Sequence, residues 1–384
     1  MKKVKASLLV LIILAAAVFA SGCWNYKEVD KMSIVAGAAV DKDENGQYRI
    51  TVEILQTSSG RDSRTTSRNL TLEGKTIFDA ARNGISVSGK KLYWGHTKVI
   101  IFSKKVARDG LVKIMDWYNR DSEAREDVHI LISQACTAEE ILSKGKEPQD
   151  IRSLILSEIL ENEVNLDKAP NVTVLQYDNE SQAKGSSSII PAVDIKKIDS
   201  KLAPQIMGTA IIKSDRLIGF LSGEETKYLE LIRNEVKEGL LIQVIQKKDK
   251  LTSVSLEIFK NKTKVTPILE DKNIKMYIKI YTTVAVDEIA SNENLLNDKG
   301  LKELKQEIES ILEKKVIALI KKVQCEYDAD IFKFSTELCE DNPKIWRKIS
   351  EDWNEVFKNL DVNVTSQVRI KNSGTLSKTL KEGD

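Results

Sequence analysis

Metal binding and nucleophilic catalysis require histidine, cysteine, serine or carboxylate side chains at particular spacings. The chain of 384 residues contains two histidines, His96 and His129, and four cysteines. The histidines fall on separate predicted elements, and neither an HExxH nor a CxxC motif indicates a metal site. No GxSxG motif marks a nucleophilic serine, and the carboxylates stand in no recognisable catalytic setting. We therefore expect no enzymatic activity, no metal and no cofactor. Both histidines are expected to be structural, with a partner contact as the alternative for His96.

Cys23 is the side chain with the clearest predicted chemistry. It follows Ala20-Ser21-Gly22, at the end of an uncharged apolar run over residues 6–20 that a lysine-rich tip precedes. This is the layout of a secretory signal sequence, and the run is shorter than the roughly 20 residues that cross a bilayer core. The order Ala-Ser-Gly-Cys resembles a bacterial lipobox, although Ala20 replaces the usual leucine. The Cys23 thiol would then carry a diacylglyceryl group, and two acyl chains anchor a protein stably.

The overall charge balance argues against nucleic acid as a partner. The chain has 59 basic and 57 acidic residues, and loss of the three lysines in residues 1–22 leaves the remainder close to neutral. Such a balance does not indicate binding to nucleic acid or broad adhesion to anionic lipid. Of the remaining cysteines, only Cys325 and Cys339 are near neighbours in sequence. They form either a disulfide or two free thiols.

The length and the pattern of elements predict more than one domain. We expect a signal peptide over residues 1–22, an N-terminal α/β region over 23–195, a C-terminal region over 196–375 and a polar tail over 376–384. The best linker candidate is the polar stretch 176–188, near the division between the two regions.

The N-terminal region is predicted to alternate strands and helices. A hairpin turns at Asn45-Gly46, with Thr51 and Glu53 on the polar side of its second arm, and a polar loop is expected over residues 56–69. A helix begins after Thr76, the predicted N-cap. The Gly-Lys-Thr before it is not a phosphate-binding loop, because Asn69 stands where that motif requires glycine. The other expected elements are strands at 99–102 and 128–132 and helices at 104–119, 138–142 and 151–164.

The C-terminal region is predicted to be an antiparallel sheet covered by helices. A hairpin over 208–221 and a helix over 224–237 precede four strand-like runs, and no crossover helices separate these runs. The runs are 240–245, 252–259, 264–269 and 274–286. A long helix over 301–323 is expected to cover the sheet, followed by a helix from Pro343 and a last strand over 362–370. The predicted fold class is therefore α+β, a multi-domain mixed α/β chain with largely antiparallel sheets packed by helices, in about three subdomains.

A charged run over residues 120–127 contains Arg120 and Arg125. Such a run is typical of a solvated loop. Because loops also carry interaction surfaces, both arginines are candidate contacts to a partner, together with His96.

Several stretches together resemble the C-subunit lipoproteins of bacterial spore germinant receptors, the Ger(x)C family. The resemblance runs from the anchor to about Gly374, and it rests on the order and spacing of the pieces more than on any one of them. The pieces are Cys23-Trp24 with Glu28, the strand from Val35 to Asp41, Gly74 to Ala80, Leu92-Tyr93-Trp94-Gly95-His96, Asn119-Arg120-Asp121 with Glu123 and Arg125, the Gly208 to Leu221 hairpin with Glu224 and Glu225, and Asp330 with Pro343, Trp346 and Trp353.

The resemblance implies a non-enzymatic lipoprotein subunit of a nutrient germinant receptor required for spore germination. It implies a place on the outer face of the cell membrane or the inner spore membrane, in complex with a large A-type subunit and a permease-like B-type subunit. The alternative is a solute-binding lipoprotein of a transport system, also anchored through a cysteine. Solute binders usually have two lobes built around parallel sheets, whereas the run of strands from 208 to 286 predicts an antiparallel sheet.

Overall fold

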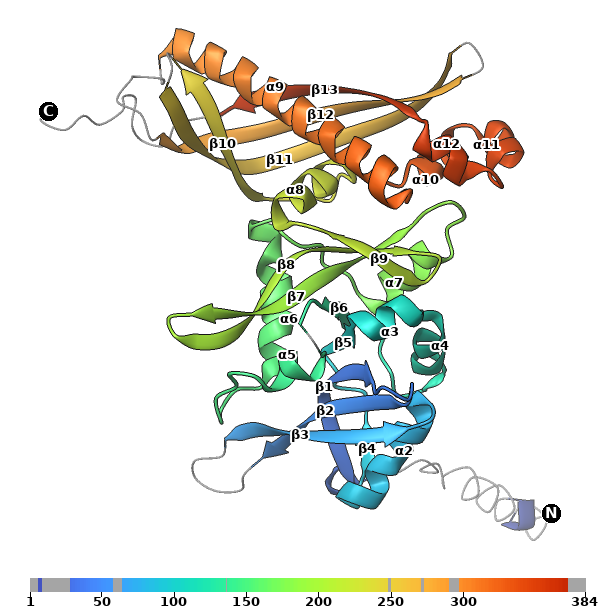
Figure 1. The fold of residues 1–384 in the computed structure, drawn as a ribbon. Helices are drawn as coiled ribbons and strands as arrows, with labels where there is room; N and C mark the ends of the chain where they lie inside the picture. The colour runs from blue at the N-terminus through green and yellow to red at the C-terminus, as the bar shows by residue number, and fades with distance from the viewer. Residues whose placement is uncertain are drawn as a thin grey trace, which may run out of the picture.

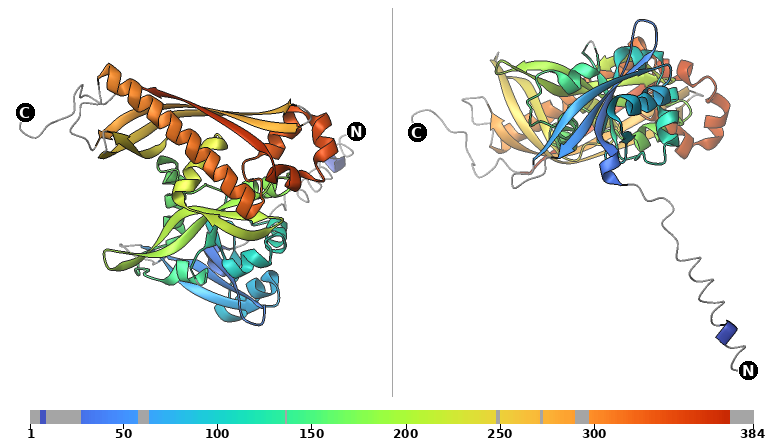
Figure 2. Two further views of the ribbon diagram at one scale, coloured as in Figure 1. Left: turned by 45° about the horizontal axis from the view of Figure 1, so that its top comes forward. Right: turned by 90° about the horizontal axis from the view of Figure 1, so that it is seen from below.

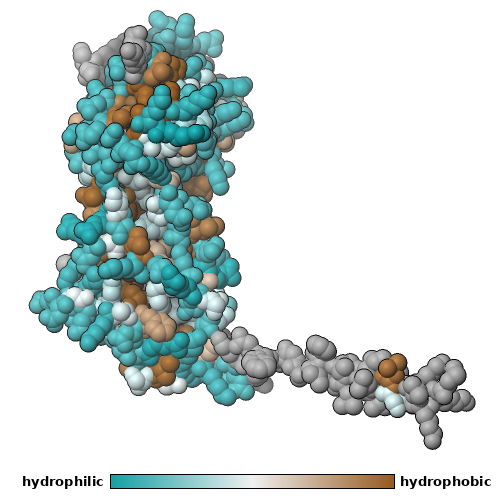
Figure 3. Space-filling model, turned by 90° about the vertical axis from the view of Figure 1, so that its right-hand side faces the viewer, coloured by the Kyte–Doolittle hydropathy of each residue, from teal (hydrophilic) through white to brown (hydrophobic). Residues whose placement is uncertain are grey.

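The computed structural model describes residues 6–8, 28–57, 64–135, 137–247, 250–270, 273–289 and 297–371 of the chain. Most of the predicted signal peptide, Cys23 and the predicted tail over 376–384 lie outside the described residues. The described chain forms two β-sheets with their helices, and helix α8 lies between the two sheets (Figure 1). The multi-domain mixed α/β fold is therefore confirmed. The face seen in Figure 3 is mainly hydrophilic, with separate hydrophobic areas.

The first sheet has nine strands in the order β3-β2-β1-β5-β6-β7-β8-β9, with β4 paired to the start of β1. Its outer pairs are antiparallel, whereas β1, β5, β6 and β7 are parallel to one another. Its strands are β1 (Met32–Lys42), β2 (Tyr48–Thr57), β3 (Thr65–Gly74), β4 (Lys91–Tyr93), β5 (Val99–Ser103), β6 (His129–Ser133), β7 (Ser188–Ile198), β8 (Lys201–Lys213) and β9 (Arg216–Leu221).

Hydrophobic cores lie on both faces of this sheet. One face packs side chains such as Val40 and Phe102 against Ile114, and the other packs Val99 and Ile101 against Leu156. Parallel strands that are covered on both faces have continuous apolar sequences, because every side chain is buried. This explains the run of small and apolar residues in β1. The helices of this region are η1 (Val29–Lys31), α2 (Ile77–Ser88), α3 (Lys104–Asp109), α4 (Val112–Arg120), α5 (Glu139–Ser143), α6 (Arg152–Asn162), η2 (Glu163–Asn165) and α7 (Val174–Ser181).

Local signals set several of these elements as predicted. The β1–β2 hairpin turns at Gly46, whose φ of 80° favours glycine. The Thr76 hydroxyl accepts a hydrogen bond from the Asp79 N–H at 3.1 Å and caps α2. The single helix predicted over 104–119 is wrong, because Gly110 adopts a φ of 123° and separates α3 from α4.

Two polar stretches were predicted incorrectly as irregular chain. Residues 65–69 of the expected loop belong to β3, which pairs with β2 along its whole length. A polar sequence is tolerated in this strand because β3 lies at the edge of the sheet. In the expected linker over 176–188, residues up to Ser181 belong to α7, which begins with a capping box at Thr173 and Gln176. The division expected after residue 195 falls inside β7, so the first sheet continues across it to β9.

The second sheet has four strands in the order β10-β11-β12-β13. The first three are antiparallel as predicted, and the runs at 252–259 and 264–269 form one long strand with irregular register near Ile258. β13 is parallel to β12, because helices α9 to α12 connect the two strands and return the chain to the same end of the sheet. The strands are β10 (Gly239–Lys247), β11 (Lys250–Glu270), β12 (Asn273–Ile289) and β13 (Asp361–Ile370).

Helix α9 lies across the second sheet, as the sequence predicted (Figures 1 and 2). Its stripe of buried side chains includes Leu304, Ile308, Leu312 and Val316. The helix predicted from Pro343 is divided into α11 and α12. The helices here are α8 (Gly223–Ile232), α9 (Asp298–Lys322), η3 (Val323–Tyr327), α10 (Phe334–Asp341), α11 (Pro343–Ile349) and α12 (Trp353–Lys358). Cys325 and Cys339 are free thiols.

Candidate functional site

Many of the residues that carry the family resemblance hold the fold together. The Asp41 carboxylate, at the end of β1, accepts hydrogen bonds from the Ala138 and Glu139 N–H groups at 2.8 and 3.0 Å and caps α5. The carboxylate of Asp330 accepts bonds from the Ser335 N–H at 2.7 Å and the Trp353 indole N–H at 3.1 Å. Burial raises the pKa of both carboxyl groups, although these hydrogen bonds oppose the shift.

Trp346 and Trp353, two further residues of the family resemblance, pack edge to face with ring centroids 5.4 Å apart. Gly185 lies beneath them, where an added Cβ would come within 2.7 Å of the Trp346 ring and 2.8 Å of the Trp353 ring. This glycine therefore provides the space that the paired indoles need.

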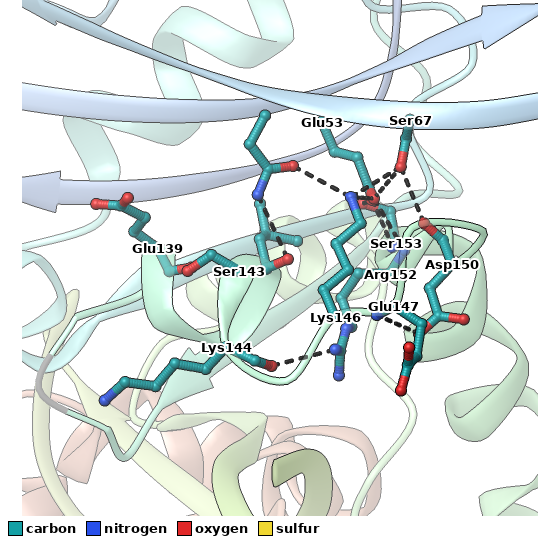
Figure 4. A network of polar contacts seen from close by, with 12 residues as sticks. Glu53, Ser67, Glu139, Ser143, Lys144, Lys146, Glu147, Asp150, Arg152 and Ser153 are labelled. Carbon is teal, nitrogen blue, oxygen red and sulfur yellow. Dashed lines mark hydrogen bonds and ion pairs between the residues drawn. The ribbon is translucent and has the colours of Figure 1, made fainter. Parts of the chain in front are cut away.

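The most enclosed charge network of the first sheet is centred on Glu53 of β2 (Figure 4). Its fully buried carboxylate accepts hydrogen bonds from the Lys146 ammonium at 2.6 Å, the Ser153 hydroxyl at 2.6 Å and the Ser67 hydroxyl at 2.7 Å. It also accepts from the backbone N–H groups of Arg152 and Ser153, the first residues of α6, at 2.9 and 2.7 Å. Glu53 thus caps a helix that lies far from it in sequence.

The electrostatic surroundings of Glu53 indicate that the negative charge of its carboxylate has a structural role. Burial alone would raise its pKa, but the hydrogen bonds from Lys146, Ser153 and Ser67 hold the pKa below its ordinary value. The sequence placed Glu53 and Thr51 on the polar side of a half-buried arm, and both side chains are buried because helices cover that face as well.

The start of β1 is the part of the first sheet nearest in sequence to Cys23. Cys23 precedes Glu28 by five residues, so their Cα atoms are at most about 18 Å apart. After η1, residues Met32 to Ile34 pair with Lys91 to Tyr93 of β4. The segment that follows β4 contains His96.

His96 is exposed, and its ring packs edge-on against the Tyr93 ring with centroids 5.8 Å apart. The neighbouring Trp94 is buried against Trp117 at a centroid distance of 5.5 Å. The segment around His96 is therefore held in place by its two aromatic neighbours, while the imidazole itself faces outward.

The charged run predicted as a loop connects α4 to β6 and lies beside β4. Glu123 forms an ion pair with Lys91 of β4 at 2.9 Å. The Tyr118 hydroxyl donates to the Arg125 carbonyl at 3.2 Å, which fixes the loop backbone. Arg125 is close enough to Tyr93 for the two side chains to interact electrostatically. Tyr93 is thus the residue shared by the two candidates, because the His96 ring packs on it and Arg125 lies within electrostatic range of it. We call Lys91, Tyr93, His96, Glu123 and Arg125 the β4 face.

Both candidate arginines form exposed pairs with carboxylates on their own segment. Arg125 donates to Asp127 at 2.8 and 2.6 Å, and Arg120 donates to Asp116 of α4 with two bonds of 2.9 Å. These hydrogen bonds raise the pKa of both guanidinium groups. Exposed pairs contribute little to stability, so either arginine can exchange its carboxylate for another. Arg120 belongs to the last turn of α4, outside the β4 face as defined.

Sequence reasoning did not single out Tyr93 and Glu123 as members of this face. The available signal was that both lie in stretches that carry the family resemblance, and that Glu123 belongs to the charged run over residues 120–127. Within the described ranges, no helix has the length and apolar character needed to cross a membrane. No group of three metal-ligating side chains occurs among the same residues.

Comparisons with known proteins cover nearly the whole chain. A family model described as "Spore germination protein N-terminal domain" matches residues 25–195, and one described as "Spore germination B3/GerAC like, C-terminal" matches residues 207–374.

Individual relatives match over their full length as well. Spore germination protein B3 of Bacillus subtilis (strain 168) is 28% identical over 93% of this chain and 95% of its own length. Spore germination protein GerQC of Bacillus cereus is 24% identical, with coverages of 95% and 98%. The crystal structure of the GerBC protein superposes with a TM-score of 0.57 at 23% identity and covers 88% of this chain and 97% of its own, which shows a shared fold.

Proposed function

Because this chain belongs to the GerAC-like family of spore germination proteins, we propose that it is the lipid-anchored C subunit of a nutrient germinant receptor. The observation that carries the proposal is the match along almost the entire length of relatives that are named as spore germination proteins. One shared domain can serve different functions in different proteins. A match of the N-terminal and C-terminal regions in the same order favours the same role for this chain and its relatives.

Anchoring is proposed to occur through Cys23 after removal of residues 1–22. The lipid would hold the folded body on the outer face of the cell membrane or of the inner spore membrane. Met32, the first residue of β1, is nine positions after Cys23, so the start of β1, which pairs with β4, lies at most about 32 Å from the lipidated residue. The β4 face is thus well placed to meet membrane-embedded subunits.

The chain is proposed to act by assembly, without catalysis. Its partners would be an A-type subunit and a permease-like B-type subunit, contacted through His96 and Arg125 on the β4 face, with Arg120 beside them. The loop backbone is fixed by Tyr118 and the aromatic neighbours of His96 are packed. The face is therefore pre-ordered for binding, which reduces the entropy lost on association.

Affinity purification from spore membranes tests the assembly proposal. A tagged chain is expected to bring down an A-type and a permease-like subunit in comparable amounts. If a chain that is present in the membrane at normal levels brings down neither subunit, the receptor proposal is wrong. The solute-binding alternative is not retained, because the full-length relatives are named as germination proteins.

Charge reversal at Arg125 is expected to weaken assembly. Arg125→Glu places a second carboxylate beside Asp127 and replaces an exposed cation of the β4 face, so the recovery of both partner subunits should fall by about tenfold. Arg120→Glu on the neighbouring turn should have a smaller effect. The measurement is quantitative immunoblotting of co-purified subunits.

The matched control is Arg369→Glu, an exposed arginine on β13 of the other sheet. It should leave the recovery of partners unchanged. If Arg125→Glu spores keep normal recovery of both subunits and germinate normally, the β4 face is not the contact.

A further inference from the structure

A cleft of about 900 Å³ lies where the helices of the first sheet meet the end of α8 and the chain that leads into the second sheet. One wall is formed by the end of α6, by η2 and the segment that follows it, and by α7; the other is formed by residues 230–238 together with Lys333. This volume is typical of a small-molecule site, and the β4 face contributes no residue to it.

The walls of the cleft carry an excess of negative charge. Among the described residues that line it, seven carboxylates accompany three basic side chains. Two of those cations are already engaged: Arg233 donates to Glu180 and to Glu235, the latter at 3.0 Å, and Lys333 pairs with the same two carboxylates at 3.2 and 2.8 Å. The remaining carboxylates of the cleft therefore outnumber the cations that could neutralise them.

Two of these remaining carboxylates are nearly completely buried, and each has one buried oxygen without a hydrogen-bond partner among the described residues. Asp167 and Glu230 are each 7% exposed, and Asp167 Oδ2 and Glu230 Oε1 are orphaned acceptors. Such atoms are rare in native proteins, because an unsatisfied buried acceptor destabilises the fold. Both belong to residues that line the cleft, where a donor from outside the chain could complete them.

The surroundings leave Asp167 Oδ2 without a partner in the described part of the chain. An added Cβ at Gly239 would lie 1.9 Å from Asp167 Oδ2, so only glycine leaves room for this carboxylate. Lys227 is near enough to interact electrostatically with Asp167, but its ammonium donates to the Leu240 carbonyl. Burial raises the pKa of Asp167 to about 7, and burial with the nearby Glu235 also raises the pKa of Glu230. A cation bound between the two would stabilise their ionised forms.

We infer that this cleft is a binding site for a small organic cation with a primary ammonium group, which donates N–H bonds to Asp167 and Glu230. An ammonium fits better than a metal ion, because no described group of three metal-ligating side chains lies close enough together to hold one. It supplies both the positive charge that the cleft lacks and the donors that the orphaned oxygens need. The inference goes beyond the proposed function and does not depend on it.

The test uses the full-length protein in detergent micelles and 1,5-diaminopentane as the probe, titrated by calorimetry. Saturable binding is expected below about 10 mM. Tetramethylammonium has the charge but no N–H donor, and it should bind at least about tenfold more weakly. Mg²⁺ at matched ionic strength should also bind at least about tenfold more weakly.

Substitutions of a carboxylate by the amide of the same shape show which side chains bind the probe. Glu230→Gln and Asp167→Asn should each weaken diaminopentane binding by at least about tenfold, the loss expected when a bond to a charged group is removed. Glu238→Gln, at an exposed position of the same cleft, should change binding less than about twofold.

Three results overturn the inference: no saturation by about 10 mM probe, equal binding of all three cations, or wild-type affinity in both neutral variants. If one variant fails to fold, the other variant and the three-cation comparison on the wild-type chain still decide the question.

Discussion

Replacement of Lys146 by methionine is expected to lower the free energy of unfolding by about 3–5 kcal/mol, the usual cost of leaving one charge of a buried pair without its partner. The Lys146 ammonium lies 2.6 Å from the carboxylate of Glu53, and the side-chain exposures of the pair are 12% and 0%. Methionine keeps most of the length of lysine but removes the charge. The measurement is urea unfolding of the full-length chain, followed by tryptophan fluorescence.

The control is a lysine of the same neighbourhood in an exposed pair. Lys201 lies 3.0 Å from Glu147, and the two side chains are 78% and 46% exposed. Lys201→Met should therefore cost less than about 1 kcal/mol. Equal effects of the two substitutions would show that the Glu53 network does not stabilise the fold.

A second replacement separates the ion pair from the helix cap. In the double variant Glu53→Leu, Lys146→Met no charge remains, yet the N–H groups of Arg152 and Ser153 lose their acceptor. Replacement of an isolated buried ion pair by apolar residues often costs little stability. Here we expect the double variant to remain less stable than wild type, because these two N–H groups have no acceptor. Recovery to wild-type stability would show that Glu53 does not cap α6.

The Lys146 effect should depend on pH with a defined sign. Because the pKa of Glu53 is lowered in the folded chain from an ordinary value of 4.5, its contribution to stability is present above that pH and is lost as pH falls through the folded pKa. The difference between wild type and Lys146→Met should therefore be largest near neutral pH and should shrink under acidic conditions, which unfolding curves at several pH values can check.

Substitution of Cys23 by alanine is expected to move the protein from the membrane fraction to the soluble fraction and to abolish incorporation of labelled palmitate. Each buried methylene contributes roughly 0.8 kcal/mol to anchoring, so loss of two acyl chains removes nearly all membrane affinity. Spores with this variant should germinate poorly, because the β4 face would no longer be held near the membrane subunits.

The control for this experiment is Cys325→Ala, which removes an exposed free thiol of η3. The Cys325→Ala substitution should change neither the membrane fractionation of the protein nor its labelling with palmitate. Unchanged membrane fractionation and palmitate incorporation after Cys23→Ala would contradict the anchor, whereas normal germination of a released chain would contradict the need for one.

The elements set by local chemistry were predictable from the sequence. The turn at Gly46, the cap at Thr76 and the apolar stripe of α9 depend on residues a few positions apart, and the structure has all three. The break at Gly110 was missed because an isolated glycine is also tolerated within a helix.

The features that join distant segments were not predictable in the same way. Nothing in the alternating pattern of β2 indicates that α6 covers Glu53, because a polar residue on a strand usually faces water. The parallel pairing of β6 with β7 follows a long excursion through α5, α6 and α7, and a sequence without an alignment does not reveal such pairings. For the same reason His96 and Arg125 could be named individually but not placed together.

The strand order has a consequence for folding if the chain is exported and anchored as proposed. The first strand to emerge, β1, ends in the interior of the sheet, and β9 at the far edge would not be complete until Leu221 had crossed the membrane. Long-range pairings of this kind form slowly, because closing each loop costs entropy before any contact is gained. While the later strands were still being translocated, β1 and β2 would expose apolar surface beside the lipid. A lipid anchor at Cys23 would hold these early strands at the membrane and so limit their diffusion to, and aggregation with, other chains.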